Sequence, residues 1–181
     1  MAALGGSVAR RYAKAIFAIG VDHGTFEILS RQLNELAALW NESADLRQTL
    51  ENPVFKLAQK RAVLQGLMPR LAPARQVQSL ALLLLERGRI ALLPAVARAY
   101  EEMCDDKLGR VRAVIKSAKP LDIASETEVR KALERRIGKK VLITTVVDPG
   151  LIGGVVAQVA GLEVDGSVAS RLRTIRQRLL N

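Results

Sequence analysis

Residues 141–180 read VLITTVVDPGLIGGVVAQVAGLEVDGSVASRLRTIRQRLL, and this stretch decides the fold class of the second half of the chain. Its first seven residues are largely apolar and β-branched, which predicts a strand. Asp148-Pro149-Gly150 supplies turn chemistry for an antiparallel return, and residues 151–159 are the predicted returning strand. Gly153 and Gly154 within that strand permit a bulge or the close approach of another backbone.

The end of the same stretch predicts a helix cap followed by an amphipathic helix. In Asp165-Gly166-Ser167, the side chain of Asp165 or of Ser167 can accept the first backbone N–H groups of a helix. The apolar residues that follow recur at helical spacing: Val168, Leu172, Ile175 and Leu179. Turn geometry and capping account for all of these glycine and polar residues, so we expect their roles to be structural.

Residues 108–140 supply the other elements of a small α/β domain. Gly109 marks a change of pattern, and residues 110–116 alternate in part between apolar and polar, which predicts a strand. Ser125 and Glu128 fit a capping box for a helix that reaches about residue 137. We therefore expect residues 108–181 to form a small α/β domain with a mixed sheet and a C-terminal amphipathic helix.

Residues 1–107 predict six short helices separated by clear breaks. In chain order these cover 8–19, begin near Thr25, open at Ser43 and stop at Asn52-Pro53, cover 57–67 before Pro69, run from a first turn containing Pro73 to Gly88, and start with Pro94 in the first turn. Gly88 can take the left-handed conformation that ends the fifth helix. The predicted fold class is mainly α, with a six-helix bundle followed by the α/β domain.

The charge of the chain is strongly basic and unevenly distributed. The 181 residues carry a formal net charge of +10. Residues 1–107 hold 14 basic and 11 acidic side chains, whereas residues 108–181 hold 14 basic and 7 acidic ones. This excess predicts an acidic partner, an anionic membrane surface or nucleic acid for the second domain. No run reaches the roughly 18 apolar residues that a membrane-spanning helix needs.

No group of residues in the sequence predicts catalysis. His23 is the only histidine and Cys104 the only cysteine, so neither a metal site nor an activated thiol is expected. Asp165-Gly166-Ser167 superficially resembles an acidic catalytic triplet, but its position before an amphipathic helix favours capping. We therefore expect a protein that is not an enzyme and that holds no cofactor.

Clusters of basic residues keep nucleic-acid binding open as the alternative function. The predicted helix that ends near residue 137, together with its exit, carries Arg130, Lys131, Arg135, Arg136, Lys139 and Lys140. Single-strand binders usually add stacking aromatics, and no aromatic residue follows Tyr100. A duplex binder needs no aromatic residue, and a solvated face or a dock for an acidic helical partner explains the same charges.

Six segments in order resemble the delta subunit family of F-type ATP synthases, whose mitochondrial counterpart is the oligomycin-sensitivity-conferring protein. They are 8–15 (VARRYAKA), Asn52-Pro53, Gly88-Arg89, 114–121 (VIKSAKPL), 148–154 (DPGLIGG) and 164–172 (VDGSVASRL). Lys116 departs from the threonine that is frequent in the family, and residues 160–162 vary a hairpin. The resemblance covers nearly the whole chain and implies a non-catalytic stator subunit, which links the catalytic head to the peripheral stalk and resists rotor torque.

The resemblance also implies two partners. Residues 1–107 would bind the N-terminal helix of an alpha subunit between the first and fifth helices, which are more apolar than one-sided burial requires. The candidate contacts are Tyr12, Ala15, Ile16, Ile19, Leu80, Leu83 and Leu84. Residues 108–181 would bind the C-terminal ends of the b subunits, with complementary charge from Arg171, Arg173, Arg176 and Arg178. The expected location is the cytoplasmic face of the bacterial inner membrane, reached only through the complex and without nucleic acid.

Overall fold

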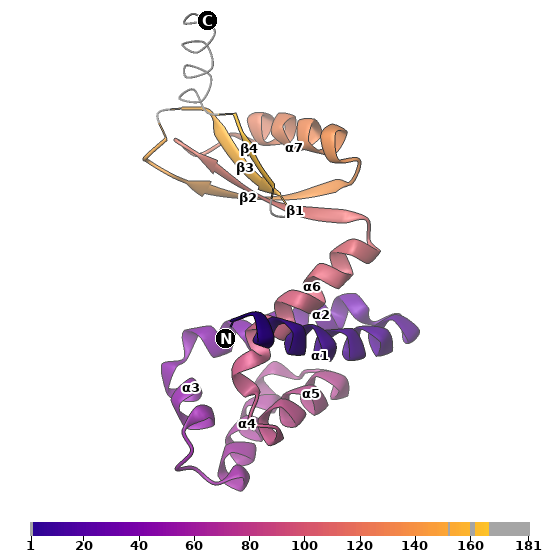
Figure 1. Ribbon diagram of the computed structural model, residues 1–181, viewed down its shortest axis with the longest axis vertical. Helices are drawn as coiled ribbons and strands as arrows, with labels where there is room; N and C mark the ends of the chain where they lie inside the picture. Colours follow the sequence, from indigo (N-terminus) through magenta and orange to yellow (C-terminus); the bar gives the residue numbers. More distant parts are fainter. Residues whose placement is uncertain (1, 152, 160–161, 167–181) are drawn as a thin grey trace, which may run out of the picture. The chain divides into compact units, whose positions relative to one another are not determined.

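The computed structural model describes residues 2–151, 153–159 and 162–166, and these form helices followed by a small mixed sheet (Figure 1). The chain divides into two compact units, residues 1–104 and 105–181. The mainly α fold class predicted from the sequence is confirmed. The predicted C-terminal helix, including its possible cap Ser167, lies outside the described residues.

The first unit is built from six α-helices and one short 3-10 helix. Their bounds are α1 Ala2–Asp22, α2 Phe26–Glu42, α3 Ala44–Glu51, α4 Leu57–Leu71, α5 Arg75–Glu86, η1 Ile90–Leu92 and α6 Leu93–Lys107. Ser43 caps α3, because its Oγ accepts a hydrogen bond from the Leu46 N–H at 3.2 Å. Helical periodicity therefore located all six α-helices, and the differences concern where some of them begin and end.

The core of the first unit is packed closely around Tyr100 of α6. The Tyr100 hydroxyl donates to the Phe26 carbonyl at 3.1 Å, and its ring meets Phe17 edge to face with centroids 5.6 Å apart. Burial, with a smaller contribution from Cys104, raises the pKa of the Tyr100 hydroxyl. Gly20 is required here, since a Cβ at that position would lie 2.7 Å from the Tyr100 oxygen. This close approach fixes α1 against α2 and α6.

Two helix boundaries in the first unit differ from the prediction. Helix α4 continues through Pro69 to Leu71, two residues short of Pro73, and ends where Ala72 takes a left-handed φ of +42°. Near a helix end, Pro69 forgoes only one intrahelical hydrogen bond, so the helix tolerates it. Pro73 precedes α5 instead of lying in its first turn, and the Ala74 N–H donates to the Gln32 side chain at 2.8 Å.

The second unit is a four-stranded sheet with strand order β2-β1-β3-β4 and one described helix, α7 (Figure 1). The bounds are β1 Arg110–Ser117, α7 Ile123–Ile137, β2 Lys140–Val147, β3 Val155–Val159 and β4 Leu162–Asp165. Strands β1 and β2 are parallel, and α7 is the crossover between them. Leu133 of α7 is buried in one cluster with Ala113, Ile115, Val141, Ala157 and Val159, so α7 covers one face of the sheet.

The predicted antiparallel return from β2 into β3 is wrong. Strand β3 pairs antiparallel with β1, on the side opposite β2. Asp148 still forms a local turn, because its Oδ1 accepts the Gly150 N–H at 2.9 Å. The chain then crosses the sheet end, and Gly153 and Gly154 precede β3, with φ +82° at Gly154. A turn motif fixes local geometry but leaves open which strand the next segment joins.

Two further local predictions in the second unit need correction. Helix α7 is capped by Asp122, whose Oδ1 accepts the Ser125 N–H at 2.8 Å, so the proposed Ser125–Glu128 capping box does not form. Hydrogen bonding from Ser125 lowers the pKa of the Asp122 carboxyl. The sequence analysis also missed β4, which pairs antiparallel with β3 and ends at Asp165. Gly166 follows, and its N–H donates to the Val155 carbonyl at 2.9 Å.

Candidate functional site

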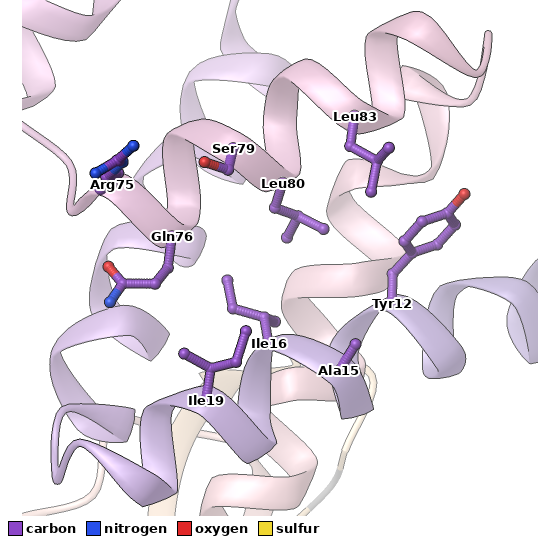
Figure 2. A pocket seen from close by; sticks show the side chains of 9 residues that line it. All are labelled: Tyr12, Ala15, Ile16, Ile19, Arg75, Gln76, Ser79, Leu80 and Leu83. Carbon is purple, nitrogen blue, oxygen red and sulfur yellow. The ribbon is translucent and has the colours of Figure 1, made fainter.

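An apolar groove lies between α1 and α5 on the surface of the first unit (Figure 2). Its volume is about 380 Å³. The α1 wall consists of residues at helical spacing: Tyr12, Ala15, Ile16 and Ile19. The α5 wall consists of Arg75, Gln76, Ser79, Leu80 and Leu83. The groove has no bulky residue at Ala15 or Ser79, so the backbone of a ligand could come close to both walls.

The groove combines buried and exposed apolar side chains. Ile16 and Leu80 form the floor, because they are only 4% and 6% exposed. Ile19 and Leu83 stand at the rim, where they are 43% and 39% exposed. Large apolar side chains that stay this exposed in one continuous groove mark a surface that another molecule covers.

Six of the seven residues predicted for this site line the groove, and Leu84 does not. Leu84 is 0% exposed and belongs to the core of the first unit. Adjacent positions on a helix differ by about 100° in direction, so Leu83 and Leu84 cannot face the same partner. The sequence analysis missed the polar part of the α5 wall, although the spacing from Leu83 and Leu80 back to Ser79, Gln76 and Arg75 follows helical periodicity.

The polar groups of the groove lie toward its ends. Figure 2 shows Tyr12 near Leu83 and, farther along the groove, Ile19 on the side where Arg75 and Gln76 lie. The Tyr12 hydroxyl accepts a hydrogen bond from Arg89 Nη1 at 3.1 Å. That bond fixes Tyr12 at one end, and Arg75 offers a cation at the other, so the groove suits an apolar helix that carries a carboxylate.

The second unit has a buried carboxylate at its start. Asp105 is 6% exposed and accepts hydrogen bonds from Arg110 Nε and Arg112 Nε, both at 2.6 Å. These charge-assisted bonds hold the last turn of α6 to the first residues of β1. Asp106 beside it is exposed and lies 3.7 Å from Lys139. This cluster satisfies its own charges, and its role is structural.

The remaining predicted residues have structural positions or lie outside the described part of the chain. Gly88 follows α5 with φ +62°. His23 is exposed, and Cys104 is buried, with its sulfur 3.7 Å from the Phe26 carbonyl oxygen. Among the described residues, no three His, Cys, Asp or Glu side chains are grouped so that they could hold a metal ion. The four arginines proposed for the stalk, Arg171, Arg173, Arg176 and Arg178, lie outside the described residues.

Comparison with known proteins identifies the family. The family model described as ATP synthase delta (OSCP) subunit matches residues 8–179. The chain belongs to the ATP synthase delta (OSCP) subunit family. A delta subunit from Geobacter sp. (strain M21) is 38% identical over 173 residues, which cover 96% of each chain. One from Anaeromyxobacter dehalogenans (strain 2CP-1) is 40% identical over 174 residues, covering 96% of this chain and 97% of the relative.

A solved structure agrees with this delta (OSCP) assignment. A chain in the mitochondrial ATP synthase hexamer of Toxoplasma gondii superposes with a TM-score of 0.72 at 26% identity, and the match covers 96% of this chain and 97% of that one. Within the described residues, no helix is long and apolar enough to cross a membrane.

Proposed function

We propose that this protein links the catalytic head of a bacterial ATP synthase to its peripheral stalk through two separate surfaces. Family membership supports a role as a stator subunit and favours it over the nucleic-acid-binding alternative. In this proposal the protein catalyses no reaction. It reaches the cytoplasmic face of the inner membrane only through the complex.

The α1/α5 groove is the proposed site for the N-terminal helix of an alpha subunit, and its geometry is the observation that carries the proposal. A guest helix laid between two helices buries an apolar stripe read out at i, i+3, i+4 and i+7. The exposed rim residues Ile19 and Leu83 would close over that stripe, and Ala15 would admit its backbone. Burial of this kind gives the slow dissociation that a stator under torque requires.

The second unit is the proposed site for the C-terminal ends of the b subunits. Its excess of basic over acidic side chains, 14 against 7 for residues 108–181, would orient charge-rich stalk helices during docking. Arg171, Arg173, Arg176 and Arg178 remain the proposed stalk contacts. The mechanism is mechanical: the head is held against rotation because each of its ends binds a different partner.

The test of the groove uses the full chain and a synthetic peptide of the alpha subunit's N-terminal residues, titrated by calorimetry. The wild type binds, and Ala15→Asp abolishes binding, because a carboxylate would be desolvated between two apolar walls. Ala18→Asp is the matched control, since Ala18 is exposed on the same helix and does not line the groove. Equal loss in both variants, or no binding by the wild type, would overturn the proposal.

A further inference from the structure

Strand β2 forms an unusual edge of the sheet in the second unit. It pairs with β1 on one side only, within the described residues, and it is eight residues long. Residues 141–147 contain no charge, no proline and no glycine. Leu142, Val146 and Val147 are 40–48% exposed. Natural proteins usually protect such edges with lysines, prolines or bulges, and β2 has none of these inside its apolar run.

Hydrogen bonds at the two ends of β2 show which backbone groups face outward. The Lys140 N–H donates to the Gly109 carbonyl at 3.3 Å, and the Asp148 N–H donates to the Ser117 carbonyl at 2.8 Å, so both face β1. Successive residues of a strand face opposite sides, so the odd-numbered N–H groups of β2 face away from β1. Val141 fits this parity, because its N–H donates to Glu134 Oε1 at 3.1 Å.

Three outward N–H groups remain after Glu134 has capped the first one. They belong to Ile143, Thr145 and Val147, and each is accompanied by an outward carbonyl group. A single side chain thus closes one end of the edge and leaves the rest open in register. The open part has the length and hydrogen-bonding pattern that an added strand uses.

The charge around the start of β2 indicates what kind of strand fits. Arg135 and Arg136, in the last turn of α7, and Lys139 and Lys140, at the start of β2, are all exposed. Lys139 faces the exposed Asp106, and the other three have no carboxylate within ion-pair distance among the described residues. No cation lies within the apolar run of β2. An added segment would therefore meet apolar side chains along most of its length and positive charge at one end.

We propose that the open edge of β2 binds an extended segment of a partner protein as a fifth strand, with apolar β-branched residues along the strand and acidic residues at its C-terminal end. The acidic end is C-terminal because an antiparallel partner, the more stable arrangement, ends beside the start of β2. This inference goes beyond the proposed function: it concerns residues 134–148 and does not depend on the α1/α5 groove or on the partner being the stalk.

Hydrogen exchange measured by NMR on the full chain tests the proposal. The probe is a synthetic peptide of alternating threonine and valine that ends in three glutamates. Without peptide, the outward amides of Ile143 and Thr145 exchange fast while those of Leu142 and Thr144 are protected by β1. Saturating peptide slows the outward amides at least about tenfold, because each gains a backbone hydrogen bond. Protection of the outward amides before any peptide is added would overturn the proposal, whether residues 167–181 or a second copy covers the edge.

A variant and a modified peptide supply the controls. Thr145→Pro removes one outward donor and leaves the bonds to β1 intact, so it weakens binding about tenfold, whereas Thr145→Val keeps the donor and binds like the wild type. Should Thr145→Pro unfold the sheet, the same peptide N-methylated at alternate residues gives the test with the wild-type protein. Equal binding by the methylated and unmethylated peptides, or by peptides with the glutamates replaced by lysines, would refute an added strand with an acidic end.

Discussion

Neighbouring leucines of α5 give a sharp prediction, because one faces the groove and the other faces the core. Leu83 is 39% exposed and Leu84 is 0% exposed. Full burial of a leucine side chain stabilises by about 2.5 kcal/mol, so covering the exposed part of Leu83 with a guest helix contributes about 1 kcal/mol. Leu83→Ala should therefore weaken binding of the alpha-subunit peptide about fivefold and change the free energy of unfolding by less than about 1 kcal/mol.

Leu84→Ala should have the opposite profile. It leaves a cavity in the core and should lower the free energy of unfolding by about 3 kcal/mol. The folded fraction should still bind the peptide with nearly wild-type affinity, because Leu84 does not line the groove. Urea unfolding followed by the fluorescence of Trp40, which is 4% exposed in the same core, measures the first quantity, and calorimetry measures the second. If Leu83→Ala destabilised the protein as much as Leu84→Ala, or left peptide affinity unchanged, the assignment of the groove would be refuted.

Three other substitutions test the packing and the capping. Gly20→Ala should destabilise the first unit by about 2 kcal/mol, because the added Cβ meets a tyrosine hydroxyl at 2.7 Å, whereas Gly66→Ala in α4 meets no atom within 4 Å and should stabilise by about 0.5–1 kcal/mol in urea titrations. Hydrogen bonding from Ser125 lowers the pKa of Asp122, so that bond stabilises the fold above the ordinary aspartate pKa of about 3.9 and is lost as the pH falls through the lower folded value. Asp122→Asn should remove this part of the acid dependence, measured as the pH profile of hydrogen exchange in α7. Asp105→Asn should destabilise the sheet by about 1–2 kcal/mol, a loss reduced by solvent because its arginine partners are 27% and 49% exposed; unchanged exchange rates in β1 would count against the role given to Asp105.

The first unit could be predicted well because its helices carry their pattern locally. Apolar residues at helical spacing located each helix, and six of the seven residues assigned to the groove line it. Leu84 was misassigned because α5 is apolar nearly all round, and hydropathy alone cannot tell a core leucine from a rim leucine one position away. The ends of the helices were less certain, since the tolerance of Pro69 depends on how near the helix end lies.

The sheet could be predicted only in part because strand pairing is not local. Residues 148–150 form the expected turn, yet β3 joins β1 because α7 makes β1 and β2 a parallel pair. The capping of α7 was misassigned for a different reason: Asp122 and Ser125 both have side chains suited to the role, and only the backbone path decides between them. The open edge of β2 likewise follows from the strand order and not from the residues of β2 alone.

The claim that the protein is a two-ended link is tested most directly by asking whether one chain holds both partners at once. The full chain would be mixed with the alpha-subunit peptide and with purified soluble b subunits, and analysed by sedimentation velocity. The account predicts one ternary complex, from which Ala15→Asp removes the peptide while the b subunits stay bound. Competition between the two partners, or loss of both through that single substitution, would contradict it.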